Sequence, residues 1–341
     1  MVSKTKTALS QEDIQRLVTA NFGAEVRVKS VEEFPEGFFN AVYAISLNQP
    51  VEGFSEVVLK VGIEPGKHIL IYEKDIMRAE IAVFKMLAER GVPVPKLFCT
   101  DFSRSQIPCD YFFMERLMGP TWSKAPTDIS PENAERLQYQ LGKYTAMMHG
   151  IKGEYFGYIK EDTSYHYPTW REAFRSFIEN LIEDGRRDGV ELPYDDVMET
   201  FEPHWHLLDE VTDPSLIHYD MWSKNILLIQ RDGEYTIDGI IDLERAFYGD
   251  PIAEFISTNT ICGDVSQAKV FQKGYSEVAG GFFAWTKSEQ IRFAMYNVYM
   301  GLLGGVEVYR YDESETPRRL MGSRYFIGQG LAKIKQLAES K

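Results

Sequence analysis

The hydrophobic pattern of the first part of the chain predicts a helix followed by a β-hairpin. Apolar residues follow Ser10 at helical spacing until Gly23, and Asp13, three residues after Ser10, completes a capping-box pattern. Apolar and polar residues then alternate over residues 26–31 and again over residues 41–47. This alternation is typical of half-buried strands, and a glycine in the connecting segment suits a turn.

A buried strand and a helix follow the hairpin, and each carries a charged residue of interest. Residues 56–61, EVVLKV, read as a buried strand interrupted by Lys60, and a buried lysine needs a counter-charge. Glu80 lies on a helix predicted over residues 74–90, whose apolar residues share one face. Residues 111–117, YFFMERL, predict a further apolar strand.

Beyond residue 130 the spacing of apolar residues is mostly helical. Ser130, followed by a proline, predicts the start of a helix that ends at His149, which we interpret as a packed or capping histidine. Another helix is predicted over residues 170–184, and more helices are predicted after Pro251. The second part of the chain is therefore expected to be larger and mainly helical.

Residues 216–251 interrupt this helical pattern with a polar loop and a hairpin. An apolar strand end leads into Asp220, and Asn225 precedes the next apolar run. The Asp-Gly pair at 232–233 lies between two apolar runs, which is a strong hairpin signal. The return strand brings Asp242 back to the end of the hairpin from which Asn225 departs. We therefore expect Asp220, Asn225 and Asp242 to converge.

Two carboxylates and a carboxamide at one place favour phosphoryl transfer. Their oxygens are hard ligands that suit Mg²⁺ held together with substrate phosphates. In phosphoryl transfer one aspartate faces the acceptor hydroxyl, while an asparagine and a second aspartate hold metal. For any single one of these residues, an ordinary Asx turn explains its presence equally well. The spacing of all three together favours a kinase.

Two motifs in this stretch resemble those of a known family. HYDMWSKN, residues 218–225, matches the pattern HxDxxxxN, and IDLERAFYGDP, residues 241–251, matches a metal-binding segment that ends in Gly-Asp-Pro. Together they resemble the aminoglycoside phosphotransferase and choline kinase-like small-molecule kinases, the APH phosphotransferase family. Protein kinases differ, because a long activation loop follows their metal-binding aspartate. Glu254 departs from the pattern, since many relatives carry aspartate there.

The resemblance implies a two-lobed, protein-kinase-like α+β fold. It predicts an N-terminal nucleotide-binding lobe over residues 1–115, with a mostly antiparallel sheet. A larger helical C-terminal lobe, over residues 116–341, would carry the catalytic hairpin and bind the acceptor. The hinge between the lobes is expected at about residues 115–119. The likeness covers nearly the whole chain and is strongest over residues 216–251.

The resemblance also implies the catalytic and metal-binding roles. Asp220 would orient the acceptor hydroxyl and accept its proton, and Asn225 and Asp242 would hold Mg²⁺. The expected reaction is the ATP- and Mg²⁺-dependent phosphorylation of a hydroxyl group on a small molecule.

Six further positions are implied to bind the nucleotide. A strand lysine paired with a helix glutamate would aim at the α- and β-phosphates, a turn would cover the phosphates, and the hinge backbone would bond the adenine edge. In that order, the positions are Lys60 with Glu80, Gly37 with Asn40, and the residues near Glu115 and Leu117. Without the resemblance, the turn fits a plain hairpin better, because it lacks a GxGxxG motif.

Composition narrows the classes of partner. A formal net charge of −14 over 341 residues argues against binding to nucleic acids or to an anionic membrane surface. The three cysteines, Cys99, Cys109 and Cys262, are too few and too scattered for a disulfide framework. We expect free thiols, no signal peptide or membrane span, and a cytoplasmic location. Nothing in the sequence indicates an oligomeric state.

The acidic residues are concentrated just before the catalytic motif. Residues 171–213 hold thirteen acidic residues against four basic ones, a net charge of −9. If this segment lines the acceptor pocket, it favours an amine-bearing acceptor, whereas solvated helix faces explain it as well. Aromatic residues interleave with the charges and suit either cation–π contacts or core packing. They are Trp170, Phe174, Phe177, Tyr194 and Trp205.

Three other functions compete with an amine-specific kinase. A catalytically inactive nucleotide-binding pseudokinase would lack the lysine, aspartate or asparagine, and all three are present. A protein kinase is disfavoured, because Gly249 follows Asp242 after only seven residues and leaves no activation loop. A kinase of a neutral sugar, a macrolide or an amino-alcohol metabolite stays open.

Overall fold

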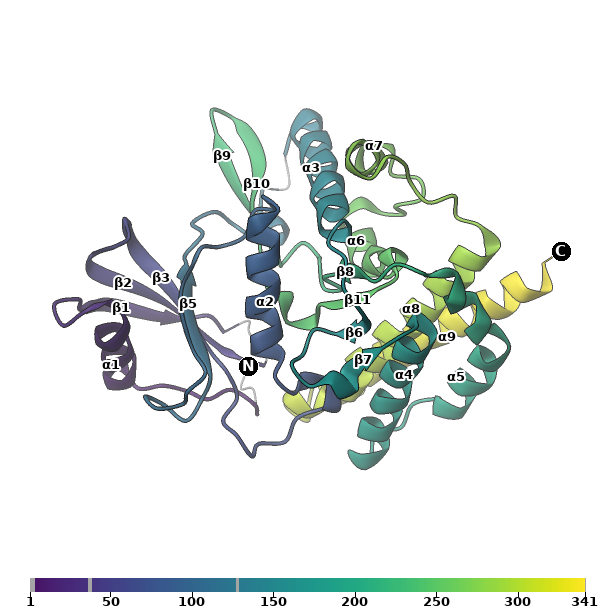
Figure 1. The fold of residues 1–341 in the computed structure, drawn as a ribbon, viewed down its shortest axis with the longest axis horizontal. Helices are drawn as coiled ribbons and strands as arrows, with labels where there is room; N and C mark the ends of the chain where they lie inside the picture. The colour runs from purple at the N-terminus through teal and green to yellow at the C-terminus, as the bar shows by residue number, and fades with distance from the viewer. Residues whose placement is uncertain (1–3, 36–38, 127–128, 341) are drawn as a thin grey trace. The chain divides into compact units, whose positions relative to one another are not determined.

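The chain folds into two compact units (Figure 1). The residues that the computed structural model describes are 4–35, 39–126 and 129–340. The first unit consists of Met1–Ile69, Pro95–Met118 and Tyr309–Thr316. The second unit consists of Leu70–Val94, Gly119–Val308 and Pro317–Lys341. Within the described ranges, every helix is too short or too polar to span a membrane.

A five-stranded antiparallel sheet forms the body of the first unit. Its strands lie in the order β1-β2-β3-β5-β4, and every neighbouring pair is antiparallel. They are β1 (Val28–Glu33), β2 (Ala41–Val51), β3 (Phe54–Val61), β4 (Leu97–Asp101) and β5 (Tyr111–Glu115). The predicted hairpin corresponds to β1 and β2, the predicted buried strand is β3, and the mostly antiparallel sheet is confirmed.

Helix α1 (Gln11–Phe22) packs its apolar face into the core of this sheet. Leu17 and Val18 are fully buried and belong to the same core cluster as Leu59 of β3. The predicted capping box is present, because the Ser10 hydroxyl accepts the Asp13 N–H at 3.0 Å and the Asp13 carboxylate accepts the Ser10 N–H at 3.2 Å. The sequence pattern thus predicts both the start and the buried face of this helix.

The second unit is mainly helical (Figure 1). Its α-helices are α2 (Ile76–Glu89), α3 (Pro131–His149), α4 (Trp170–Arg187), α5 (Tyr194–Phe201), α6 (Phe255–Cys262), α7 (Lys269–Ala279), α8 (Lys287–Val306) and α9 (Thr316–Glu339). Helix α3 begins after an N-cap serine, as predicted, since the Ser130 hydroxyl accepts the Asn133 N–H at 3.3 Å. Helix α4 runs three residues beyond its predicted end at 184.

Two small sheets of the second unit frame the loop over residues 218–225. One sheet has the order β7-β6-β11-β8, and the other is the hairpin of β9 and β10. The strands are β6 (Phe156–Tyr158), β7 (His166–Tyr167), β8 (Ser215–Ile217), β9 (Ile226–Arg231), β10 (Glu234–Ile240) and β11 (Phe247–Gly249). Asp232 and Gly233 both have positive φ, 53° and 85°, which confirms the predicted hairpin turn.

The α+β composition agrees with the prediction, whereas the predicted lobe boundaries at 1–115 and 116–341 stay a prediction. The observed units place residues 70–94 with the helical unit and residues 309–316 with the sheet. One passage from the first unit to the second lies between Met118 and Gly119, and others lie between Ile69 and Leu70 and between Thr316 and Pro317.

Helices α3 and α7 lie side by side and approach closely at two glycines (Figure 1). A Cβ at Gly142 would lie 2.1 Å from the Phe271 carbonyl oxygen, and one at Gly274 would lie 2.0 Å from the Tyr139 carbonyl oxygen. Because these neighbours are backbone atoms, they cannot rotate away as side chains do. The two helices therefore require glycine at both positions.

We expect Gly142→Ala to destabilise the fold by about 1–3 kcal/mol, because the added methyl overpacks the α3–α7 contact. Urea unfolding of the variant and the wild type measures this change. Gly328→Ala on α9 is the matched control, since a Cβ there meets nothing within 4 Å. The control should be stabilised by about 0.5–1 kcal/mol through helix propensity. Equal effects at the two positions would contradict the steric argument.

Candidate active site

His218 organises the loop that follows β8. Its ring Nδ1 lies 3.2 Å from the Asp220 backbone nitrogen, and its Nε2 lies 3.0 Å from the Ile241 carbonyl oxygen. Because Nδ1 accepts the Asp220 N–H, the ring proton belongs on Nε2, which donates to Ile241. One buried imidazole thus ties the backbone of Asp220 to the residue just before Asp242.

Asn225 forms a second connection between the same segments. Its side-chain Nδ2 donates to the Asp220 carbonyl at 2.9 Å, and its own carbonyl accepts the Ile241 N–H at 2.9 Å. Since Nδ2 is directed at Asp220, the amide oxygen Oδ1 points to the other side. The structure therefore brings together the segments that carry Asp220, Asn225 and Asp242, while the roles of the three side chains stay predictions.

Two residues of this site have left-handed backbone conformations that are uncommon outside glycine. Tyr219 has φ 65° and Asp242 has φ 63°. Tyr219 is held by burial of its ring and by a hydrogen bond from its hydroxyl to the Tyr296 carbonyl at 3.0 Å. Such strain is found at functional sites when the surrounding structure fixes it. The left-handed conformations turn the chain at Asp242 and at Tyr219, the residue before Asp220.

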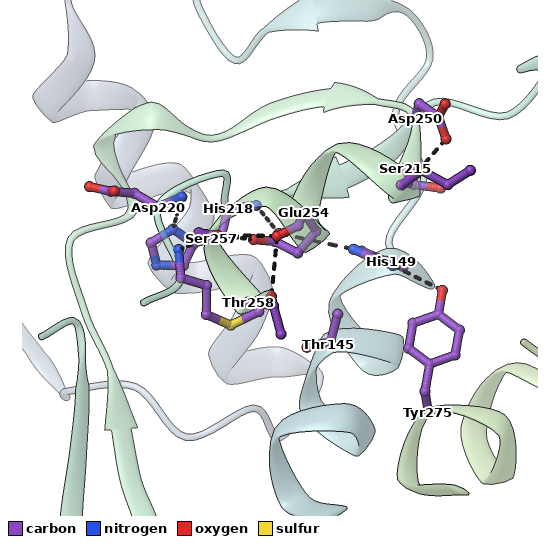
Figure 2. A network of polar contacts seen from close by, with 12 residues as sticks. Thr145, His149, Ser215, His218, Asp220, Asp250, Glu254, Ser257, Thr258 and Tyr275 are labelled. Atoms are coloured by element: carbon purple, nitrogen blue, oxygen red, sulfur yellow. Dashed lines mark hydrogen bonds and ion pairs between the residues drawn. The ribbon is translucent and has the colours of Figure 1, made fainter. Parts of the chain in front are cut away.

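Glu254 supports the loop with a buried carboxylate that lies beside His218 (Figure 2). Its Oε2 accepts the His218 N–H at 2.7 Å, and its Oε1 accepts the Ser257 hydroxyl at 3.4 Å. Ser257 in turn accepts the Met221 N–H at 3.1 Å. Burial raises the pKa of Glu254, and the donors from His218 and Tyr219 oppose this rise. The glutamate, although it departs from the family pattern, reaches the backbone of the loop.

His149, on α3, lies on the other side of Glu254 (Figure 2). Its Nδ1 is 2.9 Å from the Tyr275 hydroxyl, and its Nε2 is 4.0 Å from a Glu254 carboxylate oxygen. Burial, reinforced by the charge of Lys152, lowers the pKa of His149 to about 3. The ring is therefore neutral at pH 7, which agrees with its interpretation as a packed histidine.

The Gly-Asp-Pro turn is anchored to α8 by charge. Asp250 accepts hydrogen bonds from Arg292 Nε at 2.9 Å and from the Tyr296 hydroxyl at 2.7 Å. Trp170 Nε1 donates to the same Tyr296 hydroxyl at 2.7 Å. All four side chains are buried. A network of satisfied hydrogen bonds thus fixes the turn. Because Asp250 lies between Asp242 and Glu254, the network also holds the segment that joins these two residues.

The predicted nucleotide-binding residues occupy well-defined positions within their own units. In the first unit Lys60 and Asn40 are buried, at 6% and 4% exposure, and Glu115 ends β5 just before Leu117. In the second unit Glu80 is buried on α2. Gly37 lies outside the described residues. The Lys60–Glu80 pair and the hinge contacts stay predictions.

Helix α2, which carries Glu80, packs against the short 3-10 helix η5 (Leu243–Arg245) that follows Asp242. Among the residues that the structure describes, no group of three or more His, Cys, Asp and Glu side chains could hold a metal. Metal binding by Asn225 and Asp242 stays a prediction.

Arg245 is a further charged residue of this site, and the sequence motifs did not single it out. Its Nε lies 3.8 Å from the Asp220 carboxylate oxygen Oδ2, and its terminal nitrogen donates to Glu307 at 2.9–3.0 Å. Arg245 comes three residues after Asp242, inside the quoted motif, so a signal was present. Glu307 is 62 residues further along the chain, and nothing local pointed to it.

The acidic segment before the loop consists of α4, α5 and the 3-10 helix η4 (Glu202–Glu210). Most of its carboxylates are exposed, and several pair with arginines, as Asp209 does with Arg171 at 3.1 Å. Its aromatic side chains are buried, which assigns them to core packing. They are Trp170, Phe174, Phe177, Tyr194 and Trp205.

Comparisons with known sequences agree with the motifs. A sequence model of the phosphotransferase enzyme family (APH) matches residues 30–289. A 4-hydroxytryptamine kinase of Psilocybe cyanescens is 24% identical to this chain over 260 residues, which cover 71% of this chain and 70% of that kinase.

Solved structures agree with the fold. A protein of Ralstonia eutropha JMP134 assigned to the aminoglycoside phosphotransferases matches with a TM-score of 0.64 at 16% identity, over 96% of this chain and 99% of its own. A thermostable mutant of aminoglycoside phosphotransferase APH(4)-Ia, in a ternary complex with AMP-PNP and hygromycin B, matches with a TM-score of 0.60 at 16% identity, over 96% and 100%. The predicted two-lobed, kinase-like α+β fold is confirmed.

The buried His149 should make stability depend on pH. Between its folded pKa of about 3 and its ordinary value of 6.5, the unfolded chain binds a proton that the folded chain does not. The stability that this group contributes therefore rises with pH through that window. We expect the wild type to gain free energy of unfolding relative to His149→Gln between about pH 4 and pH 7, as measured by urea unfolding. A difference that stays constant with pH would contradict a neutral buried ring.

Proposed function

Because the chain belongs to the phosphotransferase enzyme family (APH) and is a small-molecule kinase, we propose that it uses ATP and Mg²⁺ to phosphorylate a hydroxyl group of an amine-bearing molecule. The observation that carries this proposal is the convergence of the segments of Asp220, Asn225 and Asp242 through the buried His218 ring. This arrangement offers one carboxylate to an acceptor and two hard oxygen ligands to a metal.

Asp220 acts on the acceptor hydroxyl. Its backbone is held at both ends, by His218 at the N–H and by Asn225 at the carbonyl, so the position from which its carboxylate extends is fixed. An ordinary aspartate, with a pKa of about 3.9, is a weak base for an alcohol. Asp220 therefore orients the hydroxyl and takes its proton late, which a loose transition state tolerates.

Asn225 and Asp242 hold the metal. The Asn225 Nδ2 is committed to the Asp220 carbonyl, so Oδ1 is the atom that faces a ligand. Asp242 follows β10 at the same end of the hairpin as Asn225, where its left-handed backbone turns the chain. When bound, Mg²⁺ neutralises charge on the phosphate oxygens.

ATP is proposed as the phosphoryl donor because the APH(4)-Ia structure of the same fold contains AMP-PNP. Lys60 takes the role of the phosphate-binding lysine, with Glu80 as its partner. Gly37 and Asn40 belong to the turn over the phosphates, and the backbone near Glu115 and Leu117 bonds the adenine edge. The burial of Lys60 on β3 supports this assignment, since a buried ammonium needs anionic partners.

The acceptor is proposed to carry an amine because the relatives' names point that way. 4-Hydroxytryptamine has both a hydroxyl and an amine, and the structure of the aminoglycoside phosphotransferase contains hygromycin B. The exposed carboxylates of residues 171–213 support this choice through their field, which attracts cations over about one Debye length. The buried aromatic residues of the same segment take no part, since they pack in the core.

An acceptor screen tests the function directly. Purified protein with MgATP is mixed with 4-hydroxytryptamine, hygromycin B, choline and glucose, and phosphorylated product is detected by mass spectrometry. We expect a product from an amine-bearing alcohol. A preference for glucose would overturn the amine requirement, whereas nucleotide binding without any product would favour a pseudokinase.

We expect Asp220→Ala to abolish turnover and to leave the affinity for AMP-PNP with Mg²⁺ nearly unchanged, because its partner is the acceptor. Product formation and isothermal titration calorimetry measure the two effects. Glu135→Ala is the control, since it removes an exposed carboxylate of α3 that lies outside residues 171–213. Activity of Asp220→Ala within about tenfold of wild type would refute the assignment, because a positioned proton acceptor contributes about 10²–10⁴-fold.

Asp242→Ala should weaken nucleotide binding instead, because a metal ligand is lost. AMP-PNP affinity is measured across a titration of MgCl₂ for the variant and the wild type. We expect the Mg²⁺-dependent gain in affinity to shrink in Asp242→Ala, with little change in the absence of Mg²⁺. Superimposable titrations would show that Asp242 does not bind the metal.

A further inference from the structure

Arg245 connects the candidate acceptor-binding carboxylate to a buried glutamate. On one side its Nε lies 3.8 Å from Asp220 Oδ2, and on the other its terminal nitrogen donates to both oxygens of Glu307, at 2.9 Å and 3.0 Å. The side chains of Arg245 and Asp220 are 16% and 19% exposed, so water screens this pair only partly. The guanidinium therefore lies between two carboxylates of the second unit.

Glu307 is fixed from the opposite side. The hydroxyl of Tyr72 donates to its Oε1, and both side chains are buried, at 5% and 4% exposure. A buried carboxylate needs donors for its lone pairs, and Tyr72 and Arg245 supply them. Because Tyr72 and Glu307 are held in the core, they define where the guanidinium of Arg245 can lie.

The local backbone delivers Arg245 to this position. The left-handed Asp242 reverses the chain, and η5 adds a single 3-10 turn that ends at Arg245. Helix α2 packs against η5, which leaves little room for the turn to shift. The candidate metal ligand and the arginine beside Asp220 are therefore parts of one short, rigid element.

We propose that Arg245, anchored by Glu307 and Tyr72, is a positioning residue that fixes the Asp220 carboxylate for the acceptor hydroxyl. The proposal rests on the proposed kinase function and adds a residue to it. The 3.8 Å distance is longer than a hydrogen bond, so the guanidinium attracts Oδ2 through its charge. Arg245 stays protonated throughout, while the acceptor proton passes to Asp220 as the phosphoryl group is transferred.

The positive charge is compatible with the chemistry. A neighbouring cation makes a carboxylate a weaker base, which would slow a reaction limited by proton removal. A loose phosphoryl transfer requires orientation of the hydroxyl more than strong basicity. Arg245 therefore improves the orientation of the Asp220 carboxylate, which limits the reaction. It lowers the basicity of that carboxylate, which matters less.

The competing explanation is that Arg245 only neutralises the buried Glu307. The two explanations differ when both charges are removed together. If the ion pair is merely structural, Arg245→Met leaves Glu307 uncompensated, and the double variant Arg245→Met with Glu307→Gln restores folding and turnover. If Arg245 positions Asp220, the double variant regains stability but not turnover.

The experiment measures kcat and KM for MgATP with the fastest acceptor from the panel of 4-hydroxytryptamine, hygromycin B, choline and glucose, together with AMP-PNP affinity and thermal unfolding. We expect Arg245→Met and the double variant to lose about 100-fold in kcat, as a misplaced catalytic group does, with AMP-PNP affinity unchanged. Arg245→Lys should be intermediate, since it keeps the charge without the planar fork. Arg136→Met is the control, because Arg136 pairs with Glu234 at the exposed end of the hairpin.

Each outcome decides between the explanations. Wild-type kcat in the folded double variant, or a loss of kcat as large in Arg136→Met, overturns the positioning role while the kinase function stands. A wild-type protein that phosphorylates no member of the panel overturns the proposed function and this inference with it. A selective loss of kcat in both Arg245→Met variants supports the positioning role.

Discussion

The buried carboxylate of Glu254 is the constraint on which the candidate site depends. It accepts the His218 N–H at 2.7 Å from a position that is fully shielded from solvent. An ion at such a place is expensive unless its lone pairs are satisfied, and here backbone N–H groups and the Ser257 hydroxyl do so. Once the His218 backbone is fixed, its ring can accept the Asp220 N–H and donate to Ile241. The contact therefore orders the loop and the end of the hairpin together.

The segment from Asp250 to Glu254 holds two buried acids by different means. Asp250 is paired with a full charge, and although burial disfavours the charged guanidinium, the nearby carboxylate raises the pKa of Arg292. Glu254 is satisfied mainly by dipoles, and burial raises its pKa. The first arrangement ties the turn to α8 by an ion pair, and the second ties it to the loop over 218–225 by hydrogen bonds. Removing either acid would leave buried donors without partners, which costs about 1–3 kcal/mol for each neutral group.

Tyr72, Glu307 and Arg245 form a chain of contacts that leads to Asp220 from segments far apart in the sequence. Its three residues come from a turn before α2, the end of α8 and the turn after Asp242. Only Arg245 lies within one of the two sequence motifs, and Tyr72 and Glu307 lie outside them. Tyr72 and Glu307 are buried and Arg245 is mostly shielded from solvent, so the charged groups among them need partners. An ion pair of this kind would limit the directions in which the partly exposed Asp220 carboxylate can point, which is the role proposed for Arg245.

The sequence by itself determined what depends on local spacing. The capping box of α1, the Asp-Gly turn, the N-cap of α3 and the order of Asp220, Asn225 and Asp242 follow from residues within a few positions of one another. Only the tertiary structure decided that Glu254 reaches the His218 backbone, that the aromatic residues of the acidic segment pack in the core, and that Arg245 lies between Asp220 and Glu307. These contacts join residues 25 to 62 positions apart, or depend on which face of a helix is buried. The spacing of apolar residues predicts which face of a helix or strand is buried. The partner of a buried charge depends on which distant segments pack beside it in the folded chain.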